Sequence, residues 1–457
     1  MPLHCSSKLG ANFPPILGLA RGSSNTFTFS HIKTKGSCFF SLHNKSPNTL
    51  PNHIALVSKF DKYFSSPVME ENRKMFGVAS EAEEYSKELD AAVRAVQIAC
   101  SLCQKVHDTL ISKSQSNNDN LLLLTIAGWS VKAIISWILF ECLGGENISI
   151  LPEDDVQALS RTNTSELLEA VVKTVNECLA EAPRFGVEEP KSALGTSEVL
   201  ESISRFNSIG GPCGRFWVLG PLDGSLGFEC GDQYAVALSL IEDGDVVLGV
   251  LGCPNYPMKK DLFSYDYRYH RIISKLTPPT SETWNKGCVI YAKRGSSKAW
   301  IQPLLHFNKK FVWPNHAKQA SVSSIDNLAL ATFCQPVEKA NSSHSFTEEL
   351  IHSVGLSNQA LRTYNMMKYV EIACGDAEIF MKFGRAGYKE KIWDHAAGAI
   401  IIQEAGGMVT DARGRPLDFS KGLYLENLDR CIVACSEPTL HENIIHAVDA
   451  SWLSSCL

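Results

Sequence analysis

The sequence predicts a mixed α/β fold, in which an α+β N-terminal domain is followed by an α/β C-terminal domain. Residues 81–111 carry apolar side chains along one side of a predicted helix, which would pack on a sheet. Residues 234–250 contain two apolar runs joined through Asp243-Gly244, which is a strong β-hairpin signal. From about residue 288, strand-like and helix-like segments alternate, as they do in α/β domains.

Length and composition agree with two globular domains. The chain has 457 residues, of which 44% are hydrophobic and 20% are charged. Residues 258–287 are polar and irregular, and we interpret them as the approach to a domain boundary. We therefore assign residues 76–287 to the α+β domain and residues 288–457 to the α/β domain.

The first 60 residues differ in composition from the rest of the chain. They contain six Lys or Arg residues, nine Ser and no Asp or Glu, and only one of the six cations is Arg. This pattern predicts an organelle transit peptide over residues 1–75, for a chloroplast rather than a mitochondrion, whose presequences tend to be rich in Arg. A disordered tail without an address is the alternative. Because the net charge is −6, the remainder carries −12, which argues against binding to nucleic acid polymers.

Residues 121–140 form an apolar run with a single charged residue, Lys132. The length of this run alone would suffice for a membrane span. Gly128 and Lys132 interrupt it, so we expect a buried turn followed by a core helix, and no membrane partner. The polar residues 112–120 in front of the run are expected to form a loop.

The 15 cysteines are scattered through the chain. Cys100 and Cys103 form one C-x-x-C pair inside a helical pattern, and no second pair follows at a spacing typical of zinc sites. We expect most of the cysteines to be small buried side chains in a reducing compartment.

The most informative stretch covers residues 216–255. Phe216–Leu219 is expected to form a strand that ends in a Gly-Pro turn, and Leu222-Asp223-Gly224-Ser225 follows this turn. Backbone N–H groups at such a glycine-rich start of an element can cradle a phosphate. A carboxylate there can hold Mg²⁺, which prefers oxygen ligands and often shares them with a substrate phosphate.

A second motif lies at residues 388–407, in the letters YKEKIWDHAAG followed by AIIIQEAGG. Asp394 is expected to be the N-cap of a helix that ends at Gly406-Gly407. Its carboxylate would then lie at a helix N-terminus, beside any phosphate bound there. Trp393 is more typical of a core residue than of a platform for a nucleotide base.

Together with GDQYAVAL (231–238) and Gly252-Cys253-Pro254-Asn255, these motifs resemble the lithium-sensitive, Mg²⁺-dependent phosphomonoesterase superfamily. That superfamily includes inositol monophosphatases, fructose-1,6-bisphosphatases and 3′(2′),5′-bisphosphate nucleotidases, and the form EKIWDHAAG is most similar to the plant bisphosphate nucleotidases. The resemblance runs from about residue 80 to the C-terminus. It implies a five-layer αβαβα architecture with the active site between the two domains.

The resemblance also implies a metal centre. The family holds two or three Mg²⁺ ions through carboxylates and a backbone carbonyl group. In this chain the matching ligands would be Glu153, Asp223, Asp394 and the carbonyl oxygen of Leu222.

The same resemblance implies residues that bind and process the phosphate. Gly224 and Ser225 would bind it through their N–H groups, and Asp394 would lie beside it. Ser225 and Asp223 would be catalytic, with Ser225 helping to orient the attacking water. Lys391 would either touch the substrate phosphate or form a salt bridge, and both roles stay open.

Two positions depart from the family pattern. The leading Asp of the first motif is Gly220 here, and the Asp of an upstream Thr-x-Ala-Asp turn is Gly128 in Thr125-Ile126-Ala127-Gly128. Glycine can neither coordinate a metal nor act as a base, so we expect fewer metal ions than the family binds. Each loss would cost ~10²–10⁴ in rate, by analogy with other catalytic groups. Neighbouring carboxylates that could compensate are Asp154, Asp155, Glu229 and Asp232.

Three hypotheses about function follow from the resemblance. The chain could be a Mg²⁺-dependent bisphosphate nucleotidase of impaired activity, which converts 3′-phosphoadenosine 5′-phosphate to AMP and phosphate. It could be a pseudophosphatase that binds a nucleotide and acts as a regulatory protein. It could also be a phosphatase for an inositol phosphate. In the first two cases the partner is a small phosphorylated nucleotide.

Overall fold

The computed structural model describes twelve stretches of the chain, and these are residues 84–112, 117–145, 148–152, 159, 165–257, 286–305, 317–337, 344–356, 360–364, 366–384, 388–426 and 428–455. They belong to one compact unit, Gly77–Leu457. The transit peptide predicted for residues 1–75 lies outside the described residues. Glu153, Asp154 and Asp155, which were predicted as a metal ligand and as compensating carboxylates, also lie outside them.

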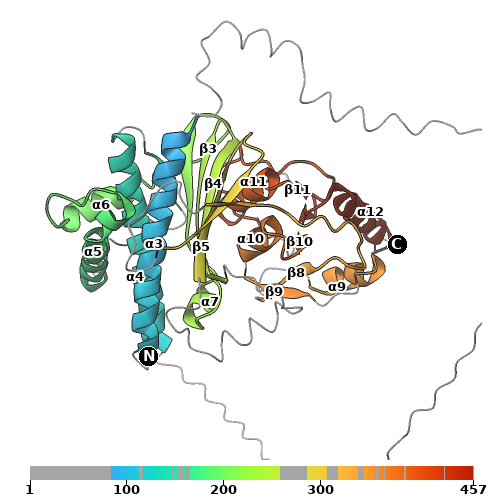
Figure 1. Cartoon of the computed structure of the whole chain (residues 1–457), viewed down its shortest axis with the longest axis horizontal. Coiled ribbons are helices and arrows are strands. Elements are labelled where there is room, and N and C mark those ends of the chain that lie inside the picture. Colours follow the sequence, from blue (N-terminus) through green and yellow to red (C-terminus); the bar gives the residue numbers. More distant parts are fainter. Residues whose placement is uncertain are drawn as a thin grey trace, which may run out of the picture. The chain divides into compact units, whose positions relative to one another are not determined.

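Five layers of alternating helices and sheets make up the described unit (Figure 1). The outer layer on one side consists of α3 (Ser86–Ser112), α4 (Asn117–Leu143), α5 (Ser165–Leu179) and α6 (Thr196–Ser204). A seven-stranded sheet follows, and then a middle layer of α10 (Met367–Ala373) and α11 (Ala396–Glu404). A five-stranded sheet and the outer helices α9 (His344–Ser353) and α12 (Pro438–Ser455) complete the stack. This arrangement confirms the expected αβαβα architecture.

The seven-stranded sheet keeps its strands in chain order from β1 to β7. Its strands are β1 (Ile150–Leu151), β2 (Arg215–Asp223), β3 (Ala235–Glu242), β4 (Asp245–Pro257), β5 (Lys286–Lys293), β6 (Ala299–Pro303) and β7 (Lys318–Ala320). Among the described strands of this sheet, only β1 and β2 pair in parallel. The boundary that we assigned between residues 287 and 288 falls inside β5, because the apolar residues of β5 pair with β4. The change from one sheet to the other therefore comes after β7.

The β3–β4 hairpin confirms the strongest local prediction from the sequence. Asp243 and Gly244 both have positive φ, at 50° and 81°, as a tight turn with the twist of the flanking strands requires. The strands pair from Glu242 and Asp245 inward. One Asp-Gly pair therefore joins two buried neighbouring strands of this sheet, and their register shifts once, between Leu240 and Ile241.

The five-stranded sheet has the order β11-β12-β10-β8-β9. Its strands are β8 (Phe333–Pro336), β9 (Leu361–Thr363), β10 (Ile379–Phe383), β11 (Met408–Asp411) and β12 (Cys431–Cys435). Strands β8, β9 and β10 are parallel, and β12 runs antiparallel to both β10 and β11. This sheet, with its flanking helices, is the α/β part that the alternating pattern predicted.

Helix α11 is buried between the two sheets, and two glycines permit its close packing. A Cβ atom at Gly249 of β4 would lie 2.7 Å from the carbonyl oxygen of Ala397. A Cβ atom at Gly398 of α11 would lie 2.2 Å from the ring of Tyr369 in α10. Side chains at these two positions would therefore push α11 away from the sheet and from α10.

Helix α4 differs from the expected turn and loop. It begins at Asn117 and continues without interruption to Leu143, so Thr125 lies inside the helix, where its Oγ1 donates a hydrogen bond to the carbonyl oxygen of Leu121 at 2.8 Å. The run of leucines favours helix, and Gly128 lacks the Asp side chain that could bond to the backbone and form a turn.

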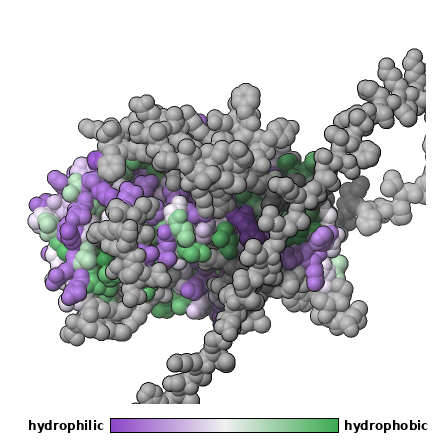
Figure 2. All heavy atoms as spheres, turned by 90° about the horizontal axis from the view of Figure 1, so that it is seen from below, coloured by the Kyte–Doolittle hydropathy of each residue, from purple (hydrophilic) through white to green (hydrophobic). Residues whose placement is uncertain are grey.

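The same helix is the one described segment that is long and apolar enough to cross a membrane. Residues 120–143 satisfy the length and composition, but 72% of the tested window is buried inside the protein, against α3, α5, α6 and β2. On the face shown in Figure 2, hydrophilic and hydrophobic side chains are mixed over the described surface. These observations favour a core helix, as the sequence predicted.

The twelve described cysteines are all free thiols, and eight of them are buried. Burial raises the pKa of the thiols of Cys100 and Cys435, which keeps them protonated and unreactive. The expectation that most cysteines are small buried side chains is confirmed for this part of the chain.

We predict that His441 makes the fold sensitive to acid. Burial lowers the pKa of His441 to about 4, from 6.5, so the folded protein disfavours the protonated ring. The contribution of the neutral ring to the free energy of unfolding is complete above pH 6.5 and is lost as the pH falls toward 4. In the variant His441→Gln, this loss should disappear. The free energy of unfolding of the wild type, relative to the variant, should fall by about 2.5 kcal/mol between about pH 7 and pH 4.5, as measured by urea unfolding. A difference that is constant over this range would contradict the prediction.

Candidate active site

The first site motif lies at the end of β2, which is longer than predicted. The strand was expected to end at Leu219, but it continues through Gly220 and Pro221 to Asp223. Its pairing with β3 shifts between Gly220 and Asp223, and Pro221 fits such an irregular place because it has no N–H group to donate. Asp223 therefore lies at the end of β2, where it pairs with Ala235 of β3.

A tight turn and a short helix follow Asp223. Gly224 has a φ of 82°, which other residues rarely adopt, and α7 (Ser225–Glu229) begins directly after it. Ser225 is exposed, and the first N–H groups of a helix have no partner inside the helix. This geometry agrees with the phosphate-binding role that the resemblance implies for Gly224 and Ser225, and that role stays a prediction.

Asp394 lies in a short 3₁₀ helix, η5 (Ile392–Asp394), immediately before α11. The predicted N-cap role is wrong, because His395 holds the N-cap position of α11 and no side chain caps the helix. Segment η5 packs against β2 and β3, so it brings Asp394 toward Asp223. Burial raises the pKa of Asp394, and the negative charge of Asp223 raises it further.

Two buried lysines, which the sequence analysis did not single out, share this region. Lys368 of α10 and Lys382 of β10 are 3% and 8% exposed. Burial and the charge of Lys382 lower the pKa of Lys368 to about 7, while Glu390, Asp223 and Asp394 raise it. A signal was present in the sequence, since each lysine interrupts an apolar run, in MMKYV and IFMKF.

A buried chain of hydrogen bonds continues from these lysines. Lys382 Nζ lies 2.7 Å from Glu390 Oε2, and His395 Nε2 lies 2.9 Å from the same oxygen. On the other side of the ring, His395 Nδ1 lies 2.7 Å from the hydroxyl group of Tyr369. Burial raises the pKa of Glu390, but the hydrogen bonds and charges of His395 and Lys382 outweigh it and lower the pKa to about 2. Burial lowers the pKa of His395 to about 4, so this ring is neutral at pH 7.

Glu390, Asp394 and His395 place their ligand atoms within 4.8 Å of one another, as a metal site would. However, Glu390 Oε2 already accepts hydrogen bonds from Lys382 and His395. Both ring nitrogens of His395 are also engaged, so we interpret His395 as structural and keep Asp394 as a candidate metal ligand. The second oxygen of Glu390, Oε1, is buried and has no hydrogen-bond partner.

The neighbours of Asp394 in the motif have modest roles. Trp393 is 5% exposed and belongs to the core, as its sequence context predicted. Lys391 Nζ lies 5.2 Å from the centre of the Trp393 ring, and the backbone of Lys391 pairs with Tyr424. The proposed contact of Lys391 with a substrate phosphate stays a prediction.

The two glycines that replace carboxylates occupy different surroundings. A Cβ atom at Gly220 would lie 3.5 Å from the Cβ of Ala237 and 3.6 Å from the carbonyl oxygen of Trp393. An Asp side chain at position 220 would therefore start beside Asp394 without a clash. Gly128 lies within α4, and a Cβ atom there would meet nothing within 4 Å.

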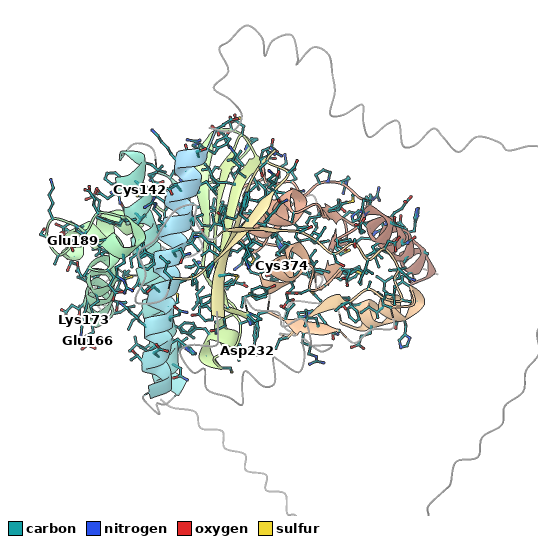
Figure 3. The ribbon with its side chains drawn as sticks, viewed as in Figure 1. Cys142, Glu166, Lys173, Glu189, Asp232 and Cys374 are labelled. Carbon is teal, nitrogen blue, oxygen red and sulfur yellow. The ribbon has the colours of Figure 1, made fainter. Side chains whose placement is uncertain are left out.

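Of the candidate compensating carboxylates, two are described. Asp232, labelled in Figure 3, accepts hydrogen bonds from the N–H group of Gln233 at 2.9 Å and from the hydroxyl group of Tyr364 at 3.4 Å. Both of its carboxylate oxygens are thus engaged. Glu229 is half-buried on α7.

The residues present fit one divalent cation better than two. Asp223 and Asp394 are carboxylates that repel each other, which a cation between them would relieve. The described titratable groups of this region are three carboxylates and two lysines, because His395 is neutral. Lys368, with a pKa of about 7, is about half protonated at pH 7, so the groups sum to about −3 + 1.5 = −1.5. Asp223, Asp394 and the carbonyl oxygen of Leu222 would hold the cation, and Glu153 lies outside the described residues.

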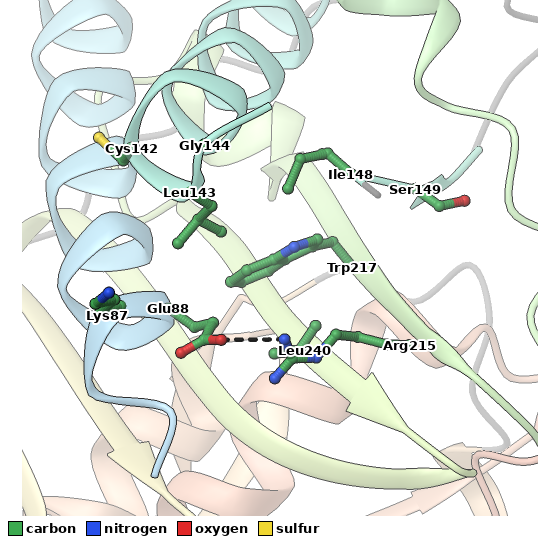
Figure 4. Close-up of a pocket in the computed structure, with 10 residues that line it drawn as sticks. All are labelled: Lys87, Glu88, Cys142, Leu143, Gly144, Ile148, Ser149, Arg215, Trp217 and Leu240. Atoms are coloured by element: carbon green, nitrogen blue, oxygen red, sulfur yellow. Dashed lines mark hydrogen bonds and ion pairs between the residues drawn. The ribbon is translucent and has the colours of Figure 1, made fainter. Parts of the chain in front are cut away.

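A cavity lined by described residues is separate from these carboxylates (Figure 4). It has a volume of about 760 Å³ and lies between α3, α4 and the sheet, on the face to which Trp217 points. Across it, Glu88 pairs with Arg215 at 3.0 Å. Gly220 lies an odd number of residues from Trp217 along β2 and faces the opposite layer, so the cavity does not belong to the candidate site.

The fold and the two motifs define a class of protein. Residues 130–453 match the inositol monophosphatase family model, and the chain belongs to that family. It is 53% identical over 373 residues to the 3′,5′-bisphosphate nucleotidase AHL of Arabidopsis thaliana, which covers 81% of this chain and 98% of that protein. It is 35% identical over 354 residues to a 3′(2′),5′-bisphosphate nucleotidase of Oryza sativa, with 77% of this chain and 91% of that one covered.

The structure of Mycobacterium tuberculosis SuhB matches 81% of this chain and 98% of its own, at 15% sequence identity and a TM-score of 0.46.

We predict that replacing Asp394 by Asn stabilises the metal-free protein and removes its response to metal. The raised pKa of Asp394 shows that the folded protein disfavours the charged carboxylate, which Asn lacks. In wild type, Mg²⁺ at about 100 times its Kd should add about 2.7 kcal/mol to the free energy of unfolding, and Asp394→Asn should abolish this gain. Thermal melting with EDTA or Mg²⁺ measures both effects.

The matched control is Asp245→Asn, because Asp245 is an exposed Asp at the start of β4, beside the end of β3 that lies opposite to the one paired with Asp223. It should keep the response to Mg²⁺. An unchanged response in Asp394→Asn would show that Asp394 does not bind the metal.

Proposed function

We propose that this chain is a slow, Mg²⁺-dependent phosphomonoesterase that acts on 3′,5′-bisphosphate nucleotides and converts 3′-phosphoadenosine 5′-phosphate to AMP and phosphate. The observation that carries the proposal is the approach of Asp394 to Asp223, from two different layers, beside the turn at Gly224. The name of the Arabidopsis thaliana relative, at 53% identity over 373 residues, supports the choice of substrate class.

The residues of the chain would bind and orient the phosphate. When bound, Mg²⁺ would supply positive charge that stabilises the phosphoryl oxygens and lowers the pKa of water. The N–H groups at Gly224 and Ser225 would donate hydrogen bonds to the phosphate, and the Ser225 hydroxyl group would help to orient the attacking water. Lys368 and Lys382 lie in a buried region, where their positive charges act strongly on a dianionic substrate.

The activity should be slow because carboxylates are missing. Position 220 lies beside Asp394, and a carboxylate there could reach the site, but Gly220 has no side chain. Gly128 lies inside a continuous helix. Each missing group would cost ~10²–10⁴ in rate, and such losses do not add when the groups act as a unit.

A second candidate function is a nucleotide-binding protein without turnover. The continuity of α4 through Thr125 and Gly128 favours it, because the turn that would present a carboxylate at this point of the chain is not formed. A phosphatase for inositol phosphates is the third candidate, and the family alone supports it.

The first prediction from this proposal concerns turnover by the natural chain. Phosphate release from 3′-phosphoadenosine 5′-phosphate should be detectable with Mg²⁺, and Asp223→Asn should reduce it by ~10² or more, because a metal ligand is weakened. Equilibrium binding of the nucleotide should be measured on the same samples. Tight binding without release would favour the binding protein, and faster release from an inositol monophosphate would favour the third candidate. The absence of both binding and release would contradict both nucleotide hypotheses.

The second prediction is a gain of function at position 220. Gly220→Asp should raise the rate of phosphate release by ~10²–10⁴, because the new carboxylate starts 3.6 Å from the carbonyl oxygen of Trp393, beside Asp394. Gly220→Asn is the matched control, since it has the same shape without the charge, and it should show no such gain. Gly128→Asp should raise the rate less, because position 128 lies inside the continuous helix α4 and not in a turn. Equal rates for wild type and Gly220→Asp would show that other groups already replace the missing carboxylate.

A further inference from the structure

Helix α10 contacts the chain segments that carry both candidate metal ligands. At its start, the N–H group of Met366 donates a hydrogen bond to Asp223 Oδ2 at 2.7 Å. This bond crosses from the middle helical layer to the end of β2 in the seven-stranded sheet. One oxygen of Asp223 is therefore fixed by a backbone group of α10.

One turn later, α10 reaches the segment of Asp394. The hydroxyl group of Tyr369 lies 2.7 Å from Nδ1 of His395, which is the residue after Asp394 in the chain. On the other side of the ring, Nε2 lies 2.9 Å from Glu390, which Lys382 holds at 2.7 Å. Since Glu390 is ionised and accepts, the neutral ring donates from Nε2, and Nδ1 therefore accepts the hydrogen bond from Tyr369.

The packing of α10 on α11 leaves little freedom in this arrangement. The ring of Tyr369 lies against Gly398, where a Cβ atom would come within 2.2 Å of it. Tyr369 and His395 are fully buried, so water cannot replace a lost hydrogen bond between them. A buried polar group without a partner destabilises the folded state, so the Tyr369 hydroxyl group and His395 Nδ1 are held together.

We propose that Tyr369 is a positioning residue for the metal centre, and that α10 sets the separation of Asp223 and Asp394. Tyr369 acts through His395, which directly follows Asp394 in the chain. The Met366 N–H group acts directly on Asp223. Partners that orient metal ligands from outside the coordination shell usually contribute about 10–100-fold in metal affinity. This inference rests on the proposed function, because it assumes that the two carboxylates hold a divalent cation.

The test compares two tyrosines that are both buried and hydrogen-bonded through their hydroxyl groups, of which only Tyr369 contacts His395. Tyr369→Phe removes the hydroxyl group next to His395, and Tyr256→Phe removes that of a tyrosine which is also buried and which donates to Asp376. Both variants should lose stability. Only Tyr369→Phe should weaken the binding of Mn²⁺, used as a probe for Mg²⁺, by about tenfold in an electron paramagnetic resonance titration. With 3′-phosphoadenosine 5′-phosphate, kcat should fall in Tyr369→Phe at saturating metal, because Asp394 is misplaced.

Each outcome decides a separate question. Equal Mn²⁺ affinities of wild type and Tyr369→Phe, with equal loss of stability in both Phe variants, would overturn the positioning role and leave the proposed function intact. A wild-type chain that binds no Mn²⁺ would overturn both. If Tyr369→Phe does not fold, Glu390→Gln provides the second measurement. It removes the charged acceptor that orients His395, so it should also weaken Mn²⁺ binding, and an unchanged affinity in that folded variant would overturn the proposal.

Discussion

The structure depends on the close packing of α11 between its two sheets. Gly249 lets the backbone of α11 approach β4, and Gly398 lets it approach α10, at distances that no side chain would permit. Because α11 starts directly after Asp394, this packing also fixes the carboxylate against the end of β2. The core and the candidate site are thus determined by the same contact, and a change in the depth of α11 would alter both.

Local signals in the sequence were sufficient for much of this fold. The Asp243-Gly244 turn and the end of α11 at Gly406-Gly407 follow from residues that adopt backbone conformations unfavourable for others. The predicted layers followed mainly from the family resemblance. The course of β2 through Gly220-Pro221 was not predicted, because the strand continues across an irregularity in its pairing with β3 that the local sequence does not show.

The site was predicted less completely than the fold. The pattern around Asp223 and Asp394 was visible, whereas Lys368, Lys382 and their partner Glu390 could not be placed, since only tertiary structure shows that they share one buried region. The charge of this region also cannot be read from one motif. It comes from strands and helices of several layers, and its small negative sum explains why the loss of a single carboxylate at Gly220 matters.

Helix α4 has a consequence for the synthesis of the chain. It is apolar on every side, and it is buried by β2 together with α3, α5 and α6. The strands β3 to β5, on which its partner α3 packs, end only at Lys293, long after α4 has left the ribosome. During this interval the apolar side chains of α4 that are buried in the native fold, such as Ile134 and Ile138, lack part of the layers that pack around α3 and α4, and exposed apolar surface promotes aggregation. A chaperone that holds the nascent N-terminal half would therefore raise the yield of native protein.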